Sequence, residues 1–396
     1  MFRILIRTTP ARSFQVLSAQ PSPSFSISSA TYNKFGSRRN MADSSAQSTP
    51  VESSSASTTP APNANANANA PAQQKQQNNK KGKRPPQPKP VMKEVRILML
   101  HGYTQSGPLF RAKTRALEKQ VIKALAPLNL VPTLIYPTAP NRLSVLEIPG
   151  YEPSPGSNSG EETELADSWA WFRREEPTWN YRFIGEGFER LADVMRAVNE
   201  EGGREVVDGI VITEGANANA NGDGAERRKE MEGVHVVRSQ VIDGVIGFSQ
   251  GGAMAAMLAA ALDHPSSPGG HPRPVLTPEH QGWAKQIRDA NKGQPLKFCV
   301  SYSGFFALPP ELGWLWEPKV KTPTMHVLGS LDTVVEESRS RRLVEACEDA
   351  VVVVHPGGHF VPVKKEWVAP LVGFIIGCLE KSAEQETNKA EEEEKL

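Results

Sequence analysis

The chain has 396 residues, with 45 Lys or Arg and 44 Asp or Glu, so its formal net charge at pH 7 is +1. This balance gives no bulk electrostatic basis for binding nucleic acid or a membrane surface, and the three cysteines have no metal-ligand or disulfide spacing. No apolar run reaches the roughly 20 residues that a membrane-spanning helix needs, so we expect no stable membrane insertion.

Residues 1–40 are basic and rich in serine, and the first acidic residue of the chain is Asp43. A basic, acid-poor leader of this kind is typical of a mitochondrial transit peptide, and it lacks the continuous apolar core of a secretory signal. An extension without an import function is the alternative, and a second start at Met41 would give a cytoplasmic form. The sequence therefore predicts a mitochondrial or cytoplasmic protein that is not secreted.

Residues 41–92 are dominated by Ser, Pro, Ala, Asn and Gln, with an Ala-Asn repeat at 61–70. Such a segment cannot bury enough apolar surface to offset the entropy lost on ordering, so we predict a disordered linker. Its basic cluster at 80–84 is interpreted as solvated, with nuclear localisation or anion binding as the alternative. Residues 383–396 are strongly acidic and are predicted to form a disordered tail.

The folded domain is expected to span residues 93–382, where apolar periodicity begins and ends. Short apolar runs predict strands and apolar residues three or four apart predict helices. The predicted strands are 95–100, 130–136, 241–246, 296–301, 322–329 and 351–355. The predicted helices are 109–125, 185–198, a run ending at 262, 335–347 and much of 361–379. Alternation of this kind predicts an α/β fold, with a mostly parallel central sheet and helices on both faces.

Three stretches of the domain lack this periodicity. Residues 206–238 and 264–295 are rich in Gly, Pro or Ala-Asn and are predicted to be surface insertions. Residues 141–183 combine Pro, Gly and acidic residues with aromatic side chains that gather between Trp169 and Phe183. Aromatic residues in a loop-like segment are typical of a lid or pocket wall, and packing in the core is the alternative.

The strand at 241–246 leads into Gly247-Phe248-Ser249-Gln250-Gly251, a Gly-x-Ser-x-Gly motif that a helix follows. In this context the serine stands on a sharp turn between strand and helix. The flanking glycines leave room for the strand and the helix to approach without Cβ clashes, and the helix N-terminus stabilises negative charge. Ser249 is therefore a candidate nucleophile, although the motif alone also fits a plain glycine-rich turn.

Two further candidate residues follow predicted strands at their carboxyl ends. Asp332 follows the strand 322–329, and His359 follows the strand 351–355. Because the carboxyl ends of parallel strands meet at one edge, and because Ser, Asp, His is the order found in α/β-hydrolases, we expect a catalytic triad. His359 is the expected general base and Asp332 the acid that orients it.

An oxyanion that develops on the substrate needs two hydrogen-bond donors. We expect them to be the backbone N–H groups of Gln250, directly after the nucleophile, and of Tyr103, in the loop after the first strand.

Other polar residues fit these roles less well. His101 is the competing base, but a His-Gly pair after a first strand is typical of the loop that carries an oxyanion donor. His326 and His355 lie within strands and are predicted to be buried, and Glu336 and Glu337 are interpreted as helix N-terminal acids. Nothing has metal-ligand spacing, so we predict no metal and no cofactor.

Several strings together resemble one known family. They are HGYTQSG (101–107), WAWF (169–172), DGVIGFSQGG (243–252), SYSGF (301–305), GSLD (329–332) and HPGGHFVP (355–362). Over about residues 95–379, interrupted by the two insertions, the chain resembles the fungal family of serine hydrolases (FSH) of the α/β-hydrolase superfamily. The resemblance implies an α/β-hydrolase fold with Ser249, Asp332 and His359 as the triad, and an acyl-enzyme that cleaves carboxylic esters or thioesters of small to medium acyl groups.

The resemblance leaves alternatives for the function. Some similar proteins are thioesterases that act on acyl carriers in polyketide pathways, and a non-catalytic binding protein on the same fold is a further alternative. Others are fused to dihydrofolate reductase, but the elbow motif is not the Gly-x-Gly-x-x-Gly of a dinucleotide site. The expected partner is a small acyl ester or thioester, with no nucleic acid. A lipase acting at membranes is disfavoured because no clear amphipathic anchor is visible.

Overall fold

The computed structural model describes residues 4–5, 91–150, 165–176, 178, 180–200, 210–214, 234–263 and 276–395. The chain divides into two compact units, one of Met1–Thr9 and Pro88–Leu396 and the other of Pro10–Gln87. Apart from 4–5 and 91–92, the predicted transit peptide and linker lie outside the described residues. The fold described below belongs to the first unit.

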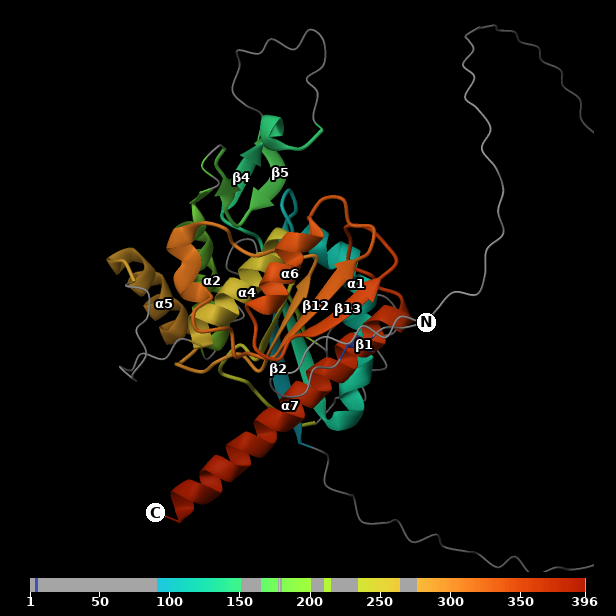
Figure 1. The fold of residues 1–396 in the computed structure, drawn as a ribbon. Helices are drawn as coiled ribbons and strands as arrows, with labels where there is room; N and C mark the ends of the chain where they lie inside the picture. Colours follow the sequence, from blue (N-terminus) through green and yellow to red (C-terminus); the bar gives the residue numbers. More distant parts are fainter. Residues whose placement is uncertain are drawn as a thin grey trace, which may run out of the picture. The chain divides into compact units, whose positions relative to one another are not determined.

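A mostly parallel sheet forms the centre of this unit (Figure 1). Its inner strands lie in the order β13 (Val351–His355), β12 (Thr324–Gly329), β11 (Phe298–Tyr302), β10 (Gly244–Phe248), β2 (Met92–Leu100) and β3 (Leu130–Pro137), each parallel to the next. At the edges, β1 (Ile4–Leu5) and β8 (Ile210–Glu214) are antiparallel, and β9 (Val236–Val237) pairs with the start of β2. The predicted strands and the predicted α/β class are confirmed.

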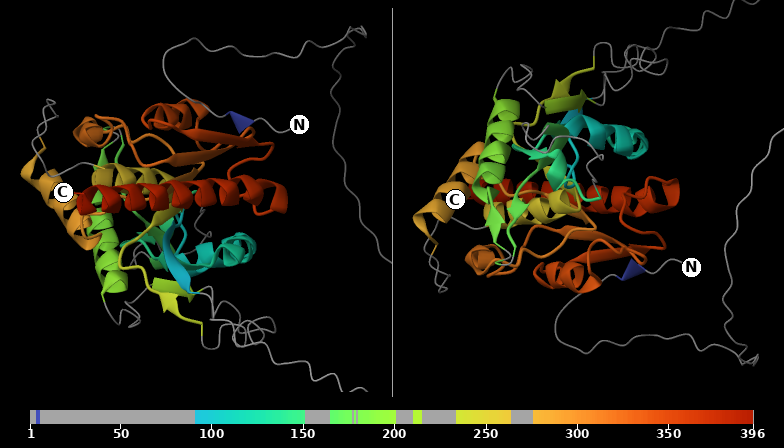
Figure 2. Two further views of the ribbon diagram at one scale, coloured as in Figure 1. Left: turned by 90° about the horizontal axis from the view of Figure 1, so that it is seen from below. Right: turned by 90° about the horizontal axis from the view of Figure 1, so that it is seen from above.

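Helices cover both faces of the sheet (Figures 1 and 2). On one face, α1 (Gly107–Leu125) and α7 (Lys365–Glu394) share an apolar cluster with the sheet. On the other, α2 (Ile184–Asn199), α4 (Gln250–Asp263), α5 (Pro278–Ala290) and α6 (Glu337–Glu345) contribute to a second cluster. Successive strand residues alternate between the clusters, with Leu98 in one and Met99 in the other, as a pleated strand requires.

None of the helices in the described ranges combines the length and apolar character that crossing a membrane requires.

Both expected insertions contain regular structure. Within 264–295 the structure has helix α5, whose buried His280, Trp283 and Ile287 recur at helical spacing, so the prediction of an insertion was wrong from residue 278 onward. Within 206–238, the edge strand β8 extends the sheet beyond β3. Residues 201–209, 215–233 and 264–275 lie outside the described part of the chain.

The acidic C-terminal segment is helical rather than disordered. The buried residues of α7 stop at Cys378, but the helix continues to Glu394 with exposed side chains. Glu, Lys and Ala favour helices, and adding turns to an existing helix avoids the cost of nucleation. An ion pair between Lys389 and Glu393, four residues apart, supports the last turns.

The aromatic segment is part of the core where the structure describes it. Antiparallel pairs join β4 (Asn141–Ser144) to β5 (Leu165–Ala170), and β6 (Arg173–Arg174) to β7 (Tyr181–Arg182). Trp171, Phe172 and Tyr181 are buried in the cluster with α2 and α4, and Trp169 packs against it half-buried. The packing alternative therefore holds for these residues, while Trp179 lies outside the described residues. Short 3₁₀ turns, η1 (Ala126–Leu128), η2 (Val145–Glu147) and η3 (Pro310–Leu315), complete the elements.

Candidate active site

Ser249 stands on a tight turn between β10 and α4. Its φ is +54°, a left-handed conformation that non-glycine residues seldom adopt, and its N–H donates to the Tyr302 carbonyl at 2.8 Å. A Cβ on Gly247 would lie 2.0 Å from the Gly251 carbonyl oxygen, and a Cβ on Gly251 would lie 2.2 Å from the Leu100 carbonyl oxygen. Both glycines are therefore required for strand and helix to approach, as the sequence predicted.

The structure brings the three predicted triad side chains into one hydrogen-bonded chain. His359 Nε2 lies 2.9 Å from Ser249 Oγ, and His359 Nδ1 lies 2.8 Å from Asp332 Oδ2. The side chains of Asp332 and His359 are 8% and 16% exposed, so little water competes for these bonds. This geometry lets a neutral imidazole donate from Nδ1 to the carboxylate and accept the serine proton at Nε2.

The loops that carry Asp332 and His359 are bound to each other. Ser330 N–H donates to the His355 carbonyl at 2.9 Å, and Leu331 N–H donates to the Gly357 carbonyl at 3.0 Å. A Cβ on Gly329 would lie 2.5 Å from the Gly357 carbonyl oxygen, so only glycine permits this approach. The acid and the base are thus held in register by the backbone.

Asp332 is held as a carboxylate by its hydrogen bonds. Its Oδ1 accepts from the N–H groups of Val334 at 2.9 Å and Val335 at 3.0 Å, while Oδ2 faces His359. Desolvation acts to raise the pKa of this carboxyl, but the bonds from Val335, His359 and Val334 outweigh it and lower the pKa below its ordinary value. Asp332 is therefore ionised at neutral pH.

The expected oxyanion donors lie beside the nucleophile. A Cβ on Gly102 would lie 3.4 Å from the Cβ of Ser249, so the loop that continues into Tyr103 passes next to the serine. Gln250 follows Ser249 at the first turn of α4. Within the described ranges, the backbone N–H of neither Tyr103 nor Gln250 has a hydrogen-bond acceptor, which leaves both available to a ligand.

The side chain of Gln250 has a positioning role that the sequence analysis missed. Its Oε1 accepts from Trp171 N–H at 2.8 Å, and its Nε2 donates to the Phe172 carbonyl at 2.7 Å. Trp171 Nε1 in turn donates to the His101 carbonyl at 3.0 Å. These bonds fix the aromatic segment and the loop after β2 around the start of α4.

His101 is structural, as its place in the sequence suggested. It is fully buried, its Nδ1 lies 2.8 Å from the Gly102 carbonyl oxygen, and its Nε2 accepts from Ala139 N–H at 3.0 Å. Burial lowers the pKa of His101 to about 4, with the Gly102 bond acting in the opposite sense. Both ring nitrogens are therefore occupied and cannot take a proton from Ser249. His326 and His355 are buried in strands, as predicted.

We expect the free energy of unfolding to fall as the pH is lowered from 6.5 to 4. Burial lowers the pKa of His101 and of His326 from 6.5 to about 4. Between these values the unfolded chain binds a proton on each imidazole and the folded chain does not, so this stability is complete above pH 6.5 and is lost as the pH falls toward 4. This difference between the folded and unfolded pKa values corresponds to about 3 kcal/mol of unfolding free energy per histidine. Urea denaturation across this pH range measures it.

The matched variants for this test are His326→Leu and His235→Leu. His326 Nε2 is buried without a hydrogen-bond partner in the described residues, whereas His235 is exposed. The first substitution should flatten the pH dependence more than the second does. Equal slopes in both variants would contradict the assignment.

Comparison with known proteins identifies relatives over most of the chain. A dihydrofolate reductase of Schizosaccharomyces pombe is 29% identical over 294 residues, which cover 72% of this chain and 48% of that protein. "Family of serine hydrolases 3" of Saccharomyces cerevisiae is 27% identical over 306 residues, 76% of this chain and 90% of that protein. "Esterase OVCA2" of Danio rerio is 27% identical over 272 residues, 68% and 90% of the two chains. The chain thus spans about half the length of some curated relatives and most of the length of others.

Solved structures give a weaker likeness. Zea mays acyl-protein thioesterase 2 aligns with a TM-score of 0.39 at 18% identity, covering 73% of this chain and 95% of that one.

The family described as "Serine hydrolase (FSH1)" matches residues 91–371, from the start of β2 into α7. Its match includes the elbow, the acid loop and the histidine loop, and it confirms the resemblance seen in the sequence. The chain therefore belongs to the FSH1 family of serine hydrolases and has an α/β-hydrolase fold.

Proposed function

We propose that the chain hydrolyses carboxylic esters or thioesters of small to medium acyl groups through an acyl-enzyme on Ser249. The observation that carries the proposal is the hydrogen-bonded chain from Ser249 Oγ to His359 Nε2 at 2.9 Å, and from His359 Nδ1 to Asp332 Oδ2 at 2.8 Å. A serine hydroxyl is a poor nucleophile at neutral pH unless a base takes its proton as it attacks. This arrangement supplies that base and the carboxylate that orients it.

The first half-reaction forms the acyl-enzyme. Ser249 Oγ attacks the substrate carbonyl carbon while its proton passes to His359 Nε2, and Asp332 stabilises the imidazolium. The N–H groups of Tyr103 and Gln250 are the proposed donors to the oxyanion, each worth about 3 kcal/mol of barrier. His359 then gives the proton to the departing alkoxide or thiolate, and the carbon–oxygen or carbon–sulfur bond breaks.

The second half-reaction releases the acid. Water attacks the acyl-serine carbonyl as His359 takes its proton, and the same imidazole returns a proton to Ser249 Oγ when the ester bond breaks. The products are a carboxylic acid and an alcohol or thiol. Every proton transfer in the two half-reactions passes through His359.

The surroundings of the triad favour an apolar acyl group. Leu331 precedes Asp332, Val334 follows it closely and Phe360 follows His359, and these apolar side chains are 67%, 68% and 50% exposed. Exposed apolar groups that adjoin the acid and the base in the chain offer contact to a hydrocarbon chain. Several relatives of the family are named esterases, which supports an ester as the substrate.

A fluorophosphonate probe tests the proposal directly. We expect it to label one serine, to be found at Ser249 by mass spectrometry, and the Ser249→Ala variant to remain unlabelled. Comparing p-nitrophenyl esters with acyl-CoA thioesters over a range of chain lengths then separates a general esterase from an acyl-carrier thioesterase. Folded protein that neither reacts with the probe nor turns over any ester would favour the non-catalytic alternative.

We also propose that residues 93–382 form the hydrolase domain, and that residues 1–40 direct it to mitochondria ahead of a linker at 41–92. The leader is basic and has no acidic residue before Asp43. Fusing residues 1–45 to a fluorescent reporter should place it in mitochondria, and replacing the leader's arginines with glutamine should abolish this. A diffuse cytoplasmic signal from the unmodified fusion would remove the targeting role.

A further inference from the structure

Two aromatic side chains adjoin the first turn of α4, beside the nucleophile. Phe172 is anchored there because its carbonyl accepts from Gln250 Nε2 at 2.7 Å. Phe305 comes from the loop after β11, and the last residue of that strand, Tyr302, accepts the Ser249 N–H. The rings of Phe172 and Phe305 meet edge to face with their centroids 6.4 Å apart. The pair therefore forms an apolar contact region that adjoins the elbow.

An arginine lies over the second of these rings. The guanidinium carbon of Arg339 is 4.3 Å from the centroid of the Phe305 ring, which is a cation–π contact. Phe306 N–H donates to the Arg339 carbonyl at 3.1 Å. Ser340 Oγ donates to the Gly304 carbonyl at 2.7 Å, so the start of α6 is bound to the loop after β11. Because the ring and the backbone both hold Arg339, its guanidinium is positioned in advance of any ligand.

Arg339 has no anionic partner in the part of the chain that the structure describes. Its Nε is buried and makes no hydrogen bond there, and no carboxylate of those residues forms an ion pair with it. Arg342 lies over Phe306 at 4.1 Å in a similar way, but its side chain is exposed. A half-buried guanidinium without a counter-ion bears a desolvation cost that a bound anion would offset.

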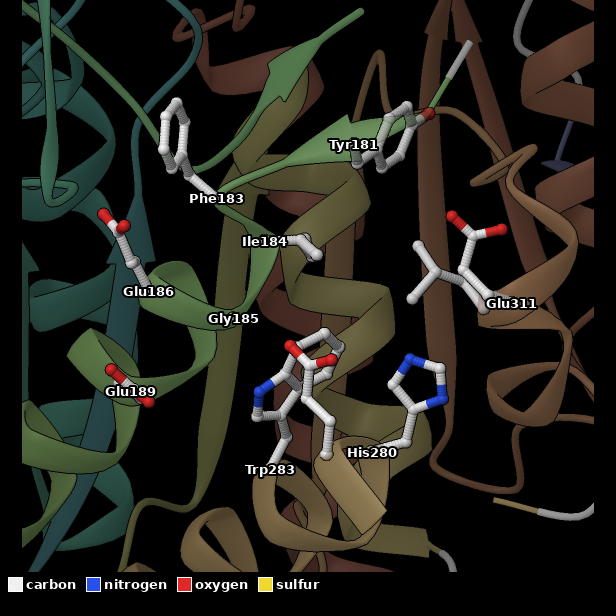
Figure 3. A pocket seen from close by; sticks show the side chains of 11 residues that line it. Tyr181, Phe183, Ile184, Gly185, Glu186, Glu189, His280, Trp283 and Glu311 are labelled. Atoms are coloured by element: carbon white, nitrogen blue, oxygen red, sulfur yellow. The ribbon is translucent and has the colours of Figure 1, made fainter. Parts of the chain in front are cut away.

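A tyrosine hydroxyl lies near the same guanidinium. Tyr181 stacks on Phe172 with ring centroids 4.2 Å apart, and its Oη is buried without a hydrogen bond of ordinary geometry among the described residues. Burial raises the pKa of Tyr181, although the Arg339 charge and the Leu308 N–H act against the shift. The phenol is therefore protonated at neutral pH and can donate. Figure 3 shows this hydroxyl pointing away from His280, which lines a separate cavity.

We propose that Arg339 and Tyr181 bind a carboxylate of the substrate, an inference that rests on the ester hydrolysis proposed above. The substrate class is then an ester or thioester whose acyl or alcohol part ends in a carboxylate. The methylene groups between the reacting carbonyl and this carboxylate would lie against Phe305. One guanidinium and one phenol provide donors for two oxygen atoms and one compensating charge, which fits a carboxylate better than a phosphate dianion.

Two pairs of matched esters test the inference and separate the two positions of the carboxylate. Ethyl hydrogen adipate is compared with ethyl hexanoate, and the hexanoate ester of 4-hydroxybutyric acid with butyl hexanoate, by pH-stat titration. In at least one pair the full chain should favour the charged ester. A lack of preference in both pairs would overturn the proposal.

Variants of the subsite should reduce this preference, measured as the ratio of kcat/KM for the charged ester to that for its neutral match. Arg339→Met keeps an apolar contact with Phe305 and should lower the ratio about tenfold, chiefly through KM, because a charged hydrogen bond is lost. Tyr181→Phe keeps the stacked ring and should lower it by a smaller factor. Arg342→Met is the matched control, since it removes an exposed arginine stacked on the neighbouring phenylalanine, and it should keep the wild-type ratio.

Direct binding distinguishes failure of the subsite from failure of the hydrolase. Adipate titrated by calorimetry into the Ser249→Ala chain should bind saturably, and adding Arg339→Met should weaken it about tenfold, whether or not any ester is cleaved. Adipate affinity or an ester ratio that Arg339→Met leaves unchanged would overturn the subsite and leave the serine chemistry standing. Tighter binding of inorganic phosphate than of adipate would overturn the carboxylate assignment.

Discussion

Replacing Ser249 by alanine should lower kcat for ester hydrolysis by about 10⁶-fold, the loss found when the nucleophile of a serine triad is removed. Without Oγ no acyl-enzyme can form, and His359 has no hydroxyl to activate. Alanine keeps the Cβ, so the backbone at φ +54° and the contacts of the elbow are retained. Rates with a p-nitrophenyl ester, measured with the wild type and the variant at equal concentration, give the ratio.

Ser303→Ala is a matched control for this change. Ser303 is also buried, has a φ of +46° and has an Oγ without a hydrogen-bond partner in the described residues. It should retain activity, which would show that losing a buried hydroxyl from a left-handed turn is not itself harmful. If Ser249→Ala retained more than a hundredth of the wild-type rate after purification to homogeneity, another residue would have to be the nucleophile.

The sequence predicted the parts of the site that local patterns describe. A glycine on each side of Ser249 indicated a close approach of strand and helix, and a Cβ at Gly247 or Gly251 would indeed meet backbone atoms at 2.0 and 2.2 Å. Asp332 and His359 each follow an apolar run, so parallel pairing alone places them at one edge. The position of each residue after a parallel strand, together with the order Ser, Asp, His along the chain, made the site predictable.

Contacts between distant segments were outside the reach of the same reasoning. The hydrogen bonds of Gln250 with Trp171 and Phe172 join residues 79 and 78 positions apart in the sequence. The residues around a glutamine do not indicate which distant backbone group its side chain will bind. Helix α5 was missed because the Pro, Gly and His before residue 278 concealed the helical spacing of His280, Trp283 and Ile287.

Asp332→Asn should lower kcat by about 10⁴-fold, as in other serine triads that lose this charge. Asp332 Oδ1 accepts from the N–H groups of Val334 and Val335, and an asparagine oxygen would keep both bonds. Its NH₂ would then face His359 Nδ1, where the carboxylate oxygen lies at 2.8 Å in the wild type. Two donors cannot share that contact, so the imidazole must carry its proton on Nε2 and can no longer take the proton of Ser249.

The fold should survive this substitution because the turn at 332–335 keeps its hydrogen bonds, and circular dichroism with thermal unfolding checks that it does. Asp349→Asn, at an exposed position, is the control for loss of one carboxylate and should keep wild-type kcat. The rate of fluorophosphonate labelling at Ser249 should fall together with kcat, since both need the same proton transfer. A folded Asp332→Asn variant with kcat within tenfold of the wild type would mean that His359 is oriented by the protein without this carboxylate, and that Asp332 serves the turn rather than the reaction.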